Sequence, residues 1–433
     1  MTSIDSLYQH YLKHPGISTD TRTISPGCLF FALKGENFDA NQFAEKAIND
    51  GAAYVIIDNP DYQLDERYLL VPDVLTALQQ LATYHRAQLN IPVIGLTGSN
   101  GKTTTKELIN AVLSEKYRTF ATKGNLNNHI GVPLSILSIQ KDIEIAIIEM
   151  GANHQKEIEF LCSIAQPTHG LITNVGMAHL DGFGGFEGVK KGKAELYAYL
   201  KLHDGFAFVC HDSQHLLEMS ETAALHKIIY YGTESNNSVW GKLLKTDPFI
   251  EISWSDNTGD HQTGLNLTGA YNFENILAAI CIGQFFEVNP VQINKGLSGY
   301  IPKNNRSQIS KTAHNTVVCD FYNANPSSMS AALKNIALLN AAHKTVIIGD
   351  MFELGTESAE QHDLIAQEAA LLDLDTVILI GKQFYTLKDE LDALFFNSPA
   401  EAKEFLAINP IKDHLVLLKG SRGMALEQLL PLL

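Results

Sequence analysis

The chain has 433 residues, of which 45% are hydrophobic, so it can build about three domains of ordinary size, each with its own core. Acidic residues number 48 and basic residues 32, which gives a formal net charge of −16. This balance argues against nucleic acid as the main partner, because neutralising a phosphate backbone needs clustered Lys and Arg. Small anionic ligands are still allowed, since they need only local positive groups.

No segment for export or membrane insertion is evident. Residues 1–5 carry neither the basic segment nor the apolar core of a signal peptide, and no apolar run approaches the ~20 residues that span a bilayer. The cysteines stand singly, and no metal-binding Cys/His spacing occurs. We therefore expect a cytoplasmic protein with no membrane span and with buried, reduced thiols at Cys28, Cys162, Cys210, Cys281 and Cys319.

Residues 1–85 are expected to form a small α/β domain. Apolar runs at 27–33 and 53–57 predict strands, and the pattern at 41–48, which Gly51 ends, predicts a helix between them.

Residues 86–305 are expected to form a central domain in which strands alternate with helices. Such alternation predicts a mostly parallel sheet with helices on both faces. The polar segment 235–268 departs from the pattern, and we expect a small antiparallel excursion there. The predicted strands are 91–96, 143–148, 170–174 and 205–210, and the predicted helices are 102–115, 187–200 and 272–286.

Residues 306–433 show the clearest alternation. The predicted strands are 316–319, 345–348, 376–380 and 414–418, separated by segments of helix length. This pattern is typical of a doubly wound, Rossmann-like domain, here without the Gly-x-Gly-x-x-Gly fingerprint. The predicted fold class is therefore α/β with three domains.

The most informative motif is the run Thr-Gly-Ser-Asn-Gly-Lys-Thr-Thr-Thr at 97–105, between the strand 91–96 and the helix that starts at 102. A strand, a glycine-bearing turn and a helix make a phosphate cradle, in which backbone N–H groups and the helix N-terminus face a polyphosphate. Lys102 can reach the terminal phosphates, and the Thr103 hydroxyl can hold Mg²⁺. The residues expected to bind nucleotide are Gly98, Ser99, Asn100, Gly101, Lys102, Thr103 and Thr104.

Two further polar residues follow strands of the same sheet. Glu149 comes directly after 143–148, and His179 follows 170–174. Because the carboxyl ends of parallel strands share one edge, both are expected near Lys102, where they could bind Mg²⁺. Alone, Glu149 could be a helix-start acid and His179 a loop histidine. The three lysines within 188–197 are read either as a solvated face or as a source of one lysine at the phosphate edge, and their spacing leaves that choice open.

Together these motifs resemble the Mur ligases, ATP-dependent amide-forming enzymes of peptidoglycan precursor synthesis, over essentially the whole chain. Leu96 stands where a strict P-loop has glycine, as in that family's version of the loop. The resemblance implies ATP and two Mg²⁺ ions, with Glu149 and His179 as metal ligands. It also implies a carbamylated lysine as a further ligand, at Lys193, with Lys191 as the alternative. Lys102, Lys193 and His179 are the residues expected to take part in catalysis.

The resemblance implies further binding residues in all three domains. The first domain resembles the family's uridine-diphosphate-binding module. The expected contacts are Asn275, Arg306 and Asp320 for the nucleotide, Thr21, Arg22 and Asn41 for the uridine diphosphate, Asn125 and Asn128 for the acceptor, and Asn323, Asn325 and Ser421 for the incoming amine.

Within the family, the segments 320–326, 349–355 and 419–422 resemble the member that adds D-alanyl-D-alanine to UDP-N-acetylmuramoyl-tripeptide through an acyl phosphate. The chain lacks the Asp-Asn-Pro-Arg motif of the diaminopimelate-adding relative. A monomer is expected. The alternatives are another ligase of this superfamily (diaminopimelate- or lysine-adding, folylpolyglutamate- or cyanophycin-type) and a regulatory protein that binds ATP without chemistry.

Overall fold

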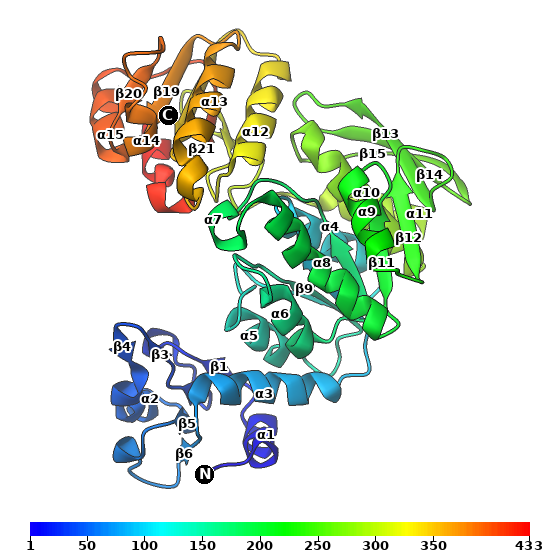
Figure 1. Ribbon diagram of the computed structural model, residues 1–433, viewed down its shortest axis with the longest axis vertical. Coiled ribbons are helices and arrows are strands. Elements are labelled where there is room, and N and C mark those ends of the chain that lie inside the picture. The colour runs from blue at the N-terminus through cyan, green and yellow to red at the C-terminus, as the bar shows by residue number, and fades with distance from the viewer.

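A computed structural model of the chain describes residues 1–433 and folds into an α/β protein with three sheet-containing parts, stacked along its long axis (Figure 1). None of its helices is both long and apolar enough to cross a membrane. The α/β class with mostly parallel sheets is confirmed. The boundaries at 85/86 and 305/306 stay predictions.

The N-terminal part is a small parallel sheet with a separate hairpin. The strand order is β1-β2-β5-β6, and β3 pairs with β4 antiparallel. The elements are α1 (Ile4–Lys13), β1 (Ile17–Ser18), η1 (Thr21–Thr23), β2 (Leu29–Phe31), β3 (Lys34–Gly35), β4 (Phe38–Asp39), η2 (Ala40–Phe43), α2 (Ala44–Asn49), β5 (Tyr54–Ile57), η3 (Pro60–Tyr62), β6 (Tyr68–Leu70) and α3 (Val74–Ala87).

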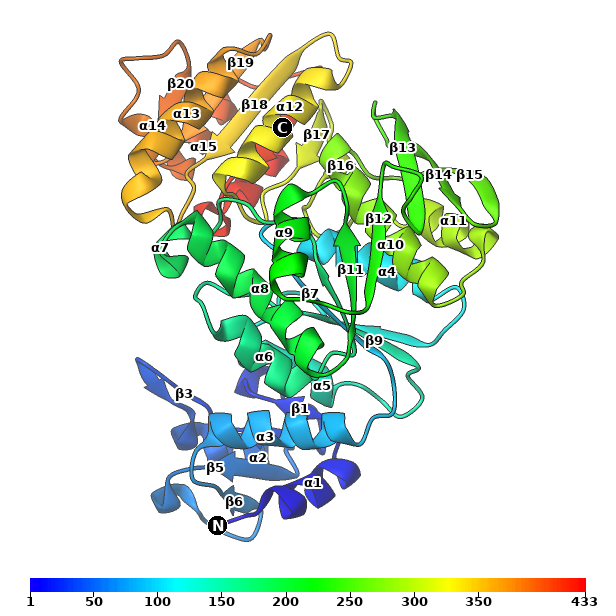
Figure 2. The same cartoon turned by 45° about the vertical axis from the view of Figure 1, so that its right-hand side comes forward.

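Helix α3 joins this part to the middle of the molecule, because it lies across two helices of the central part (Figure 2). The Arg86 guanidinium, buried on α3, donates to the carbonyls of Ala165 (2.9 Å) and Gln166 (3.0 Å). On α1, the Tyr11 hydroxyl donates to the Leu137 carbonyl at 2.6 Å. Buried polar contacts of this kind hold the two parts in one orientation, since each lost partner would leave an unsatisfied group.

The central part is a nine-stranded sheet of order β15-β14-β13-β12-β11-β10-β7-β9-β8. Pairing is parallel from β13 to β8. The pairs β13–β14 and β14–β15 are antiparallel, as expected for an excursion in 235–268. The strands are β7 (Val93–Thr97), β8 (Thr119–Ala121), β9 (Ile145–Glu149), β10 (His169–Ile172), β11 (Phe206–Cys210), β12 (Ile228–Gly232), β13 (Val239–Lys245), β14 (Glu251–Asp256) and β15 (Gly259–Gly264).

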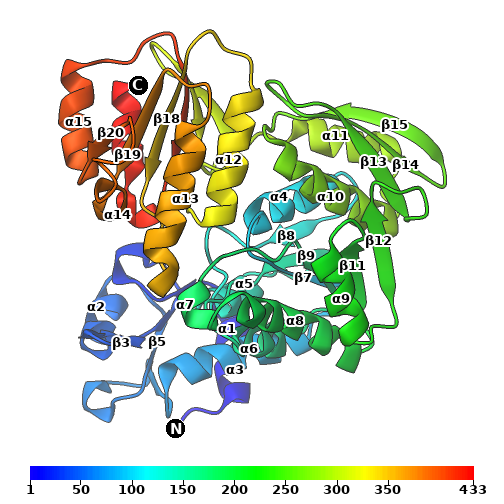
Figure 3. The same ribbon diagram turned by 45° about the horizontal axis from the view of Figure 1, so that its top comes forward.

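Helices cover both faces of this sheet (Figure 3). One face carries α4 (Lys102–Leu113), η4 (Ala270–Asn272), α10 (Phe273–Phe285) and α11 (Pro290–Gly299), and the other carries α5 (Gly131–Leu137), α6 (Glu157–Ala165), α7 (Leu180–Phe183), α8 (Phe186–Leu202) and α9 (Gln214–Thr222). Strands such as β7 and β9 are apolar at nearly every position and fully buried, as sheets covered on both faces require.

The C-terminal part is a six-stranded sheet of order β16-β17-β21-β18-β19-β20, parallel except for the edge strand β16. Separate apolar clusters pack on its two faces, as in a doubly wound fold. The elements are β16 (Gln308–Lys311), β17 (Thr316–Cys319), α12 (Pro326–Leu338), β18 (Lys344–Gly349), η5 (Gly355–Glu357), α13 (Ser358–Ala370), β19 (Thr376–Ile380), α14 (Lys382–Tyr385), β20 (Leu394–Phe396), α15 (Pro399–Ile408), β21 (Leu415–Lys419), η6 (Arg422–Met424) and η7 (Leu426–Leu432).

His169 offers a test of how the central sheet responds to acid. Its ring stacks on Phe206 with centroids 5.3 Å apart, and burial lowers its pKa from the ordinary 6.5 to about 4. Below pH 6.5 the unfolded chain therefore binds a proton that the folded chain excludes, so stability falls as the pH drops from 6.5 towards 4, by at most about 3 kcal/mol. Replacing His169 with Phe should flatten the dependence of the melting temperature on pH between 7 and 5. A variant that keeps the full wild-type slope would contradict this account.

Candidate active site

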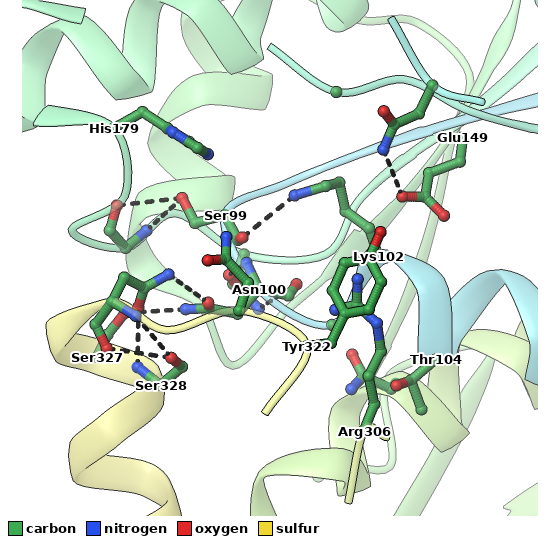
Figure 4. Close-up of a pocket in the computed structure, with 18 of the residues that line it drawn as sticks. Ser99, Asn100, Lys102, Thr104, Glu149, His179, Arg306, Tyr322, Ser327 and Ser328 are labelled. Atoms are coloured by element: carbon green, nitrogen blue, oxygen red, sulfur yellow. Dashed lines mark hydrogen bonds between the residues drawn. The ribbon is translucent and has the colours of Figure 1, made fainter. Parts of the chain in front are cut away.

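The phosphate loop connects β7 to α4 and lies at the carboxyl edge of the central sheet, as expected (Figure 4). Gly98 has φ +146° and Gly101 has φ +77°, both outside the range that other residues adopt easily. Side chains would also clash there, since a Cβ at Gly98 would lie 2.0 Å from the Thr173 hydroxyl and one at Gly101 would lie 2.8 Å from Asn275 Oδ1. The backbone can therefore run close to its neighbours only with glycine at these positions.

The Lys102 side chain folds back over this loop. Its ammonium donates to the carbonyls of Gly98 (2.7 Å) and Ser99 (3.2 Å). Burial lowers the pKa of Lys102 to about 8, and Glu149 opposes that shift. A half-buried amine poised above backbone N–H groups and a helix N-terminus is suited to a polyphosphate, whose charge would restore the protonated form.

Glu149, at the end of β9, meets Thr103 from the first turn of α4. The Thr103 hydroxyl lies 3.1 Å from Glu149 Oε2, and Asn127 Nδ2 donates to Oε1 at 2.9 Å. Glu149 is almost fully buried and lines the same cavity as Lys102. A carboxylate and a hydroxyl held together in this way form a donor set that fits Mg²⁺, which takes few protein ligands and completes its shell with water and phosphate oxygens.

His179 lines this cavity from the loop after β10, with its backbone in the left-handed region at φ +55°. Its Nδ1 lies 2.5 Å from a carboxylate oxygen of Glu353, which belongs to the C-terminal part, although the oxygen lies off the direction of a good N–H bond. Burial lowers the pKa of His179. A neutral ring of this kind keeps a nitrogen lone pair free for a metal ion.

Lys193, on α8, is buried but does not line the cavity; its ammonium lies against the Ala152 carbonyl at 3.4 Å and 5.0 Å from the centre of the Phe183 ring. Burial, followed by the nearby charge of Lys102, lowers its pKa to about 7. Lys191, by contrast, is exposed. Of the three lysines in 188–197, whose spacing leaves the choice open, Lys193 is the one that the fold buries.

A cavity of about 800 Å³ brings together most of the expected nucleotide residues from two domains (Figure 4). Asn275 donates to Asn272 Oδ1 at 3.0 Å. The Arg306 guanidinium lies 3.9 Å from the centre of the Tyr322 ring, and its buried Nε has no partner. The residues in its lining are Ser99, Asn100, Gly101, Lys102, Thr104, Asn125, Asn128, Glu149, His179, Asn275, Arg306, Asp320, Asn323 and Asn325.

Several expected contacts lie elsewhere or are already engaged. Asn41 is fully buried, and its amide bonds to Asp39 (2.6 Å) and Asp58 (2.8 Å), so it holds its own domain together and is not free to contact a ligand. Thr21 and Arg22 lie in the N-terminal part, outside the cavity.

Ser421 also stands outside the large cavity, in the C-terminal part. Its backbone N–H bonds to the Asp350 carbonyl at 3.2 Å, and its hydroxyl accepts from the Phe352 N–H at 3.0 Å. Asp350 and Phe352 line a second cavity, of about 560 Å³.

Two buried lysines were given no role of their own from the sequence. Lys106 donates to the Thr122 carbonyl at 2.7 Å and lies 3.6 Å from Glu149 Oε2. Lys419 pairs with Asp320 at 2.7 Å. Lys106 could have been found, because it follows Lys102 by one helical turn on the same face. Lys419 could not, since its partner is almost a hundred residues away.

Comparison with known proteins places this geometry in a class. Family profiles described as the Mur ligase family catalytic domain, the Mur ligase middle domain, and the Mur ligase glutamate ligase domain match residues 14–86, 96–283 and 305–422. The chain belongs to the Mur ligase family.

Individual relatives show which members of the family the chain resembles. The chain is 34% identical to the UDP-N-acetylmuramoyl-tripeptide–D-alanyl-D-alanine ligase of Escherichia coli K12, over 95% of this chain and 92% of the relative. It resembles a crystal structure of MurF from Acinetobacter baumannii with a TM-score of 0.86 and 34% identity, covering 95% of this chain and 92% of that one. The MurF ligase of Thermotoga maritima, solved in complex with ADP, matches with a TM-score of 0.84 and 26% identity, covering 96% of each chain.

Lys106 gives the first test of the site. Without its ammonium, Glu149 would be a buried carboxylate that only a bound cation can compensate, at a cost of about 3 kcal/mol or more. Lys106→Met should therefore lower the melting temperature of the free protein, and MgADP should raise it by more than in wild type. Lys116→Met, which removes a lysine just beyond the same helix, serves as the control. An equal MgADP shift in both variants and wild type would mean that Lys106 does not compensate Glu149.

Proposed function

We propose that this protein is an ATP-dependent ligase that joins the tripeptide carboxylate of UDP-N-acetylmuramoyl-tripeptide to the amine of D-alanyl-D-alanine, in peptidoglycan precursor synthesis. The observation that carries the proposal is the cavity in which the phosphate loop and Glu149 face Arg306 and Asp320 of the C-terminal part. Relatives that carry this activity in their names match the chain along 95% or more of its length.

ATP fits the cavity by the chemistry of its walls. The loop amides and Lys102 face the position of the phosphates, and the unpartnered Nε of Arg306 offers a further donor. Asp320 is held by the Ser307 N–H at 3.1 Å and by Lys419, which leaves a fixed carboxylate for ribose hydroxyls.

Mg²⁺ fits the donor set at the loop. No three His, Cys, Asp or Glu side chains gather as a metal cage anywhere in the chain, so a metal ion here needs phosphate oxygens to complete its shell, as Mg²⁺ commonly does. Thr103 and Glu149 would hold one ion, and His179 with a carbamylated Lys193 would hold a second. Bound there, the ions neutralise charge on the transferring phosphoryl group.

Lys193 is suited to carbamylation because CO₂ adds only to a neutral amine. Because burial lowers its pKa to about 7, the neutral amine is well populated at neutral pH, whereas fewer than about one in a thousand ordinary lysines are neutral there. The Ala152 carbonyl is its only hydrogen-bond partner, so no carboxylate competes for the amine.

The proposed reaction has two successive displacement steps, one at phosphorus and one at the acyl carbon. A tripeptide carboxylate oxygen bonds to the γ-phosphorus as the bond to ADP breaks. The dipeptide amine then bonds to the acyl carbon, loses its proton, and inorganic phosphate leaves. Lys102 and the loop amides would hold the phosphates in line with the attacking carboxylate, so the rate acceleration would come from positioning and fixed charge.

The outer substrates would be held by the other two domains. Thr21 and Arg22 would contact the uridine diphosphate, and Asn125 and Asn128, which line the cavity from the central domain, would contact the acceptor. The incoming dipeptide would approach from the C-terminal part, past Asn323 and Ser421. The second cavity opens there, and Glu353, which reaches His179, lines it. We propose that the protein works as a monomer.

The purified protein should release ADP only when ATP, Mg²⁺, UDP-N-acetylmuramoyl-tripeptide and D-alanyl-D-alanine are present together. Glycine, glutamate and diaminopimelate, offered in place of the dipeptide, are the matched controls. Turnover with diaminopimelate but not the dipeptide would assign another Mur ligase, and turnover with a folate and glutamate would assign the folylpolyglutamate type. Tight ATP binding without turnover under any of these conditions would favour the remaining alternative, a regulatory protein that binds ATP without chemistry.

Lys193→Ala should lower kcat by at least about a hundredfold, because a metal ligand is lost. A small carboxylate such as formate should restore part of the activity by replacing the carbamate. Binding of MgADP, followed by calorimetry, should weaken far less than kcat falls. Full activity of Lys193→Ala, or a loss that formate leaves untouched, would remove the carbamate from the proposal.

A further inference from the structure

The crest of the phosphate loop touches the C-terminal part through one side chain, Asn100. Its Nδ2 donates to the Ser327 hydroxyl at 2.8 Å, and its Oδ1 accepts from Asn325 Nδ2 at 2.8 Å. The Ser327 hydroxyl in turn donates to Asn325 Oδ1 at 2.9 Å. The three side chains therefore form a closed hydrogen-bonded ring, in which each donates once and accepts once within the ring (Figure 4).

The Asn100 member of this ring is anchored firmly in the central part. The Asn100 N–H donates to Asn174 Oδ1 at 2.9 Å, and its carbonyl accepts from the Thr173 hydroxyl at 2.6 Å. Next to it, Ser99 exchanges hydrogen bonds with the backbone of Gly176 at 2.9 and 3.1 Å. The loop crest and the segment that leads to His179 are thus one unit.

The other two members are anchored in the C-terminal part. Asn325 is the N-cap of α12, where its Oδ1 accepts from the Ser328 N–H at 2.9 Å and completes a capping box. Ser327 stands on the first turn of the same helix. The ring therefore joins two rigid supports, a phosphate loop and a helix start, that lie 225 residues apart in sequence.

Helix capping alone does not account for Asn325. A cap needs one side-chain oxygen, which Ser or Thr supplies nearly as well. The amide N–H₂ of Asn325 is used for Asn100, in the other domain. A role in binding the incoming dipeptide, expected from the sequence, competes with this bond, because the same amide group makes it.

We propose that Asn325 and Ser327 are positioning residues that lock the crest of the phosphate loop to the C-terminal part, so that docking of that part and the final shape of the loop form together. The proposal rests on the nucleotide site described under the proposed function, but not on the identity of the acceptor or the amine.

The ring has a kinetic signature. The loop and α4 belong to the central part, so nucleotide contacts with them do not require the ring, whereas the ring requires the C-terminal part to be docked. Opening the ring should therefore lower kcat by about tenfold, the effect of one or two neutral hydrogen bonds, and change the affinity for MgADP by less than about threefold.

Asn325→Ser is the sharpest variant, because it keeps a capping oxygen but is too short to reach Asn100. Small-angle X-ray scattering with Mg²⁺ and a non-hydrolysable ATP analogue should show a smaller radius of gyration for wild type than without nucleotide. Asn325→Ser should stay expanded, with an unchanged melting temperature. Ser330→Ala is the matched control, since it removes a hydroxyl of the same helix that bonds to Glu368, at 2.8 Å, inside the C-terminal part.

A double-mutant cycle separates the ring from general weakening. Because Asn100→Ala breaks the same ring, adding it to Asn325→Ser should cost nothing further in compaction. Ser327→Ala opens the ring without touching the cap, and decides the question if Asn325→Ser unfolds. If the two substitutions lower compaction independently, so that the double mutant loses more than either single mutant, the proposal is overturned. It is also overturned if Ser327→Ala shows wild-type compaction and turnover, or if nucleotide does not change the radius of gyration of the wild-type protein. The scattering measurement uses no acceptor or amine, so a wrong substrate assignment leaves its outcome intact.

Discussion

The structure depends on a concentration of positive charge that an otherwise acidic chain builds around one cavity. Lys102, Arg306 and Lys419 line this cavity from three stretches of sequence, and the buried Lys193 lies close enough to feel the charge of Lys102, whereas the chain as a whole carries a net charge of −16. Removing these amines from water is costly, and the lowered pKa values of Lys102, about 8, and Lys193, about 7, express that cost. A polyphosphate, the ligand proposed for this cavity, would offset that cost, because its negative charge favours the protonated amines.

Two carboxylates, Glu149 and Asp320, partly compensate the positive charge around the cavity. Glu149 lies between Lys106 and the Thr103 hydroxyl, and Asp320 lies against Lys419. Each acid is thus held in one place by a cation, and both acids line the cavity. Such pairs contribute little net stability when buried, but they fix orientation. These pairs keep the charged side chains in fixed positions, which is what stabilising a phosphoryl group during its transfer requires.

Much of this could be predicted from the sequence, and the parts that could not share a physical cause. Long buried strands such as β9 and β19 are apolar runs that stand out, and the strand–loop–helix around Lys102 has its own signature. The three-residue strands β8 and β20 are too short to show a period, and pairing alone makes them strands. Among site residues, the burial of Asn41 could not be predicted, because its contacts with Asp39 and Asp58 are visible only in the fold.

The contacts between domains lay furthest beyond prediction. The ring of Asn100, Asn325 and Ser327 and the approach of Glu353 to His179 join residues about two hundred positions apart, and no local pattern encodes such a meeting. The residue types were visible in their motifs; which of them face each other was not. Tertiary geometry decides that, and with it whether an asparagine serves a ligand or a neighbouring domain.

The contacts of α1 and α3 with the central part have a consequence for the choice of substrate. Because Arg86 and Tyr11 fasten the N-terminal part to the central one, the distance between the proposed uridine-diphosphate site and the phosphate loop is set by the protein. If the acceptor binds as proposed, a peptide one residue shorter would leave its terminal carboxylate short of the γ-phosphorus, and a longer one would have to bend. The length of the acceptor peptide would then be selected by the spacing of two domains, with no single pocket needed for it.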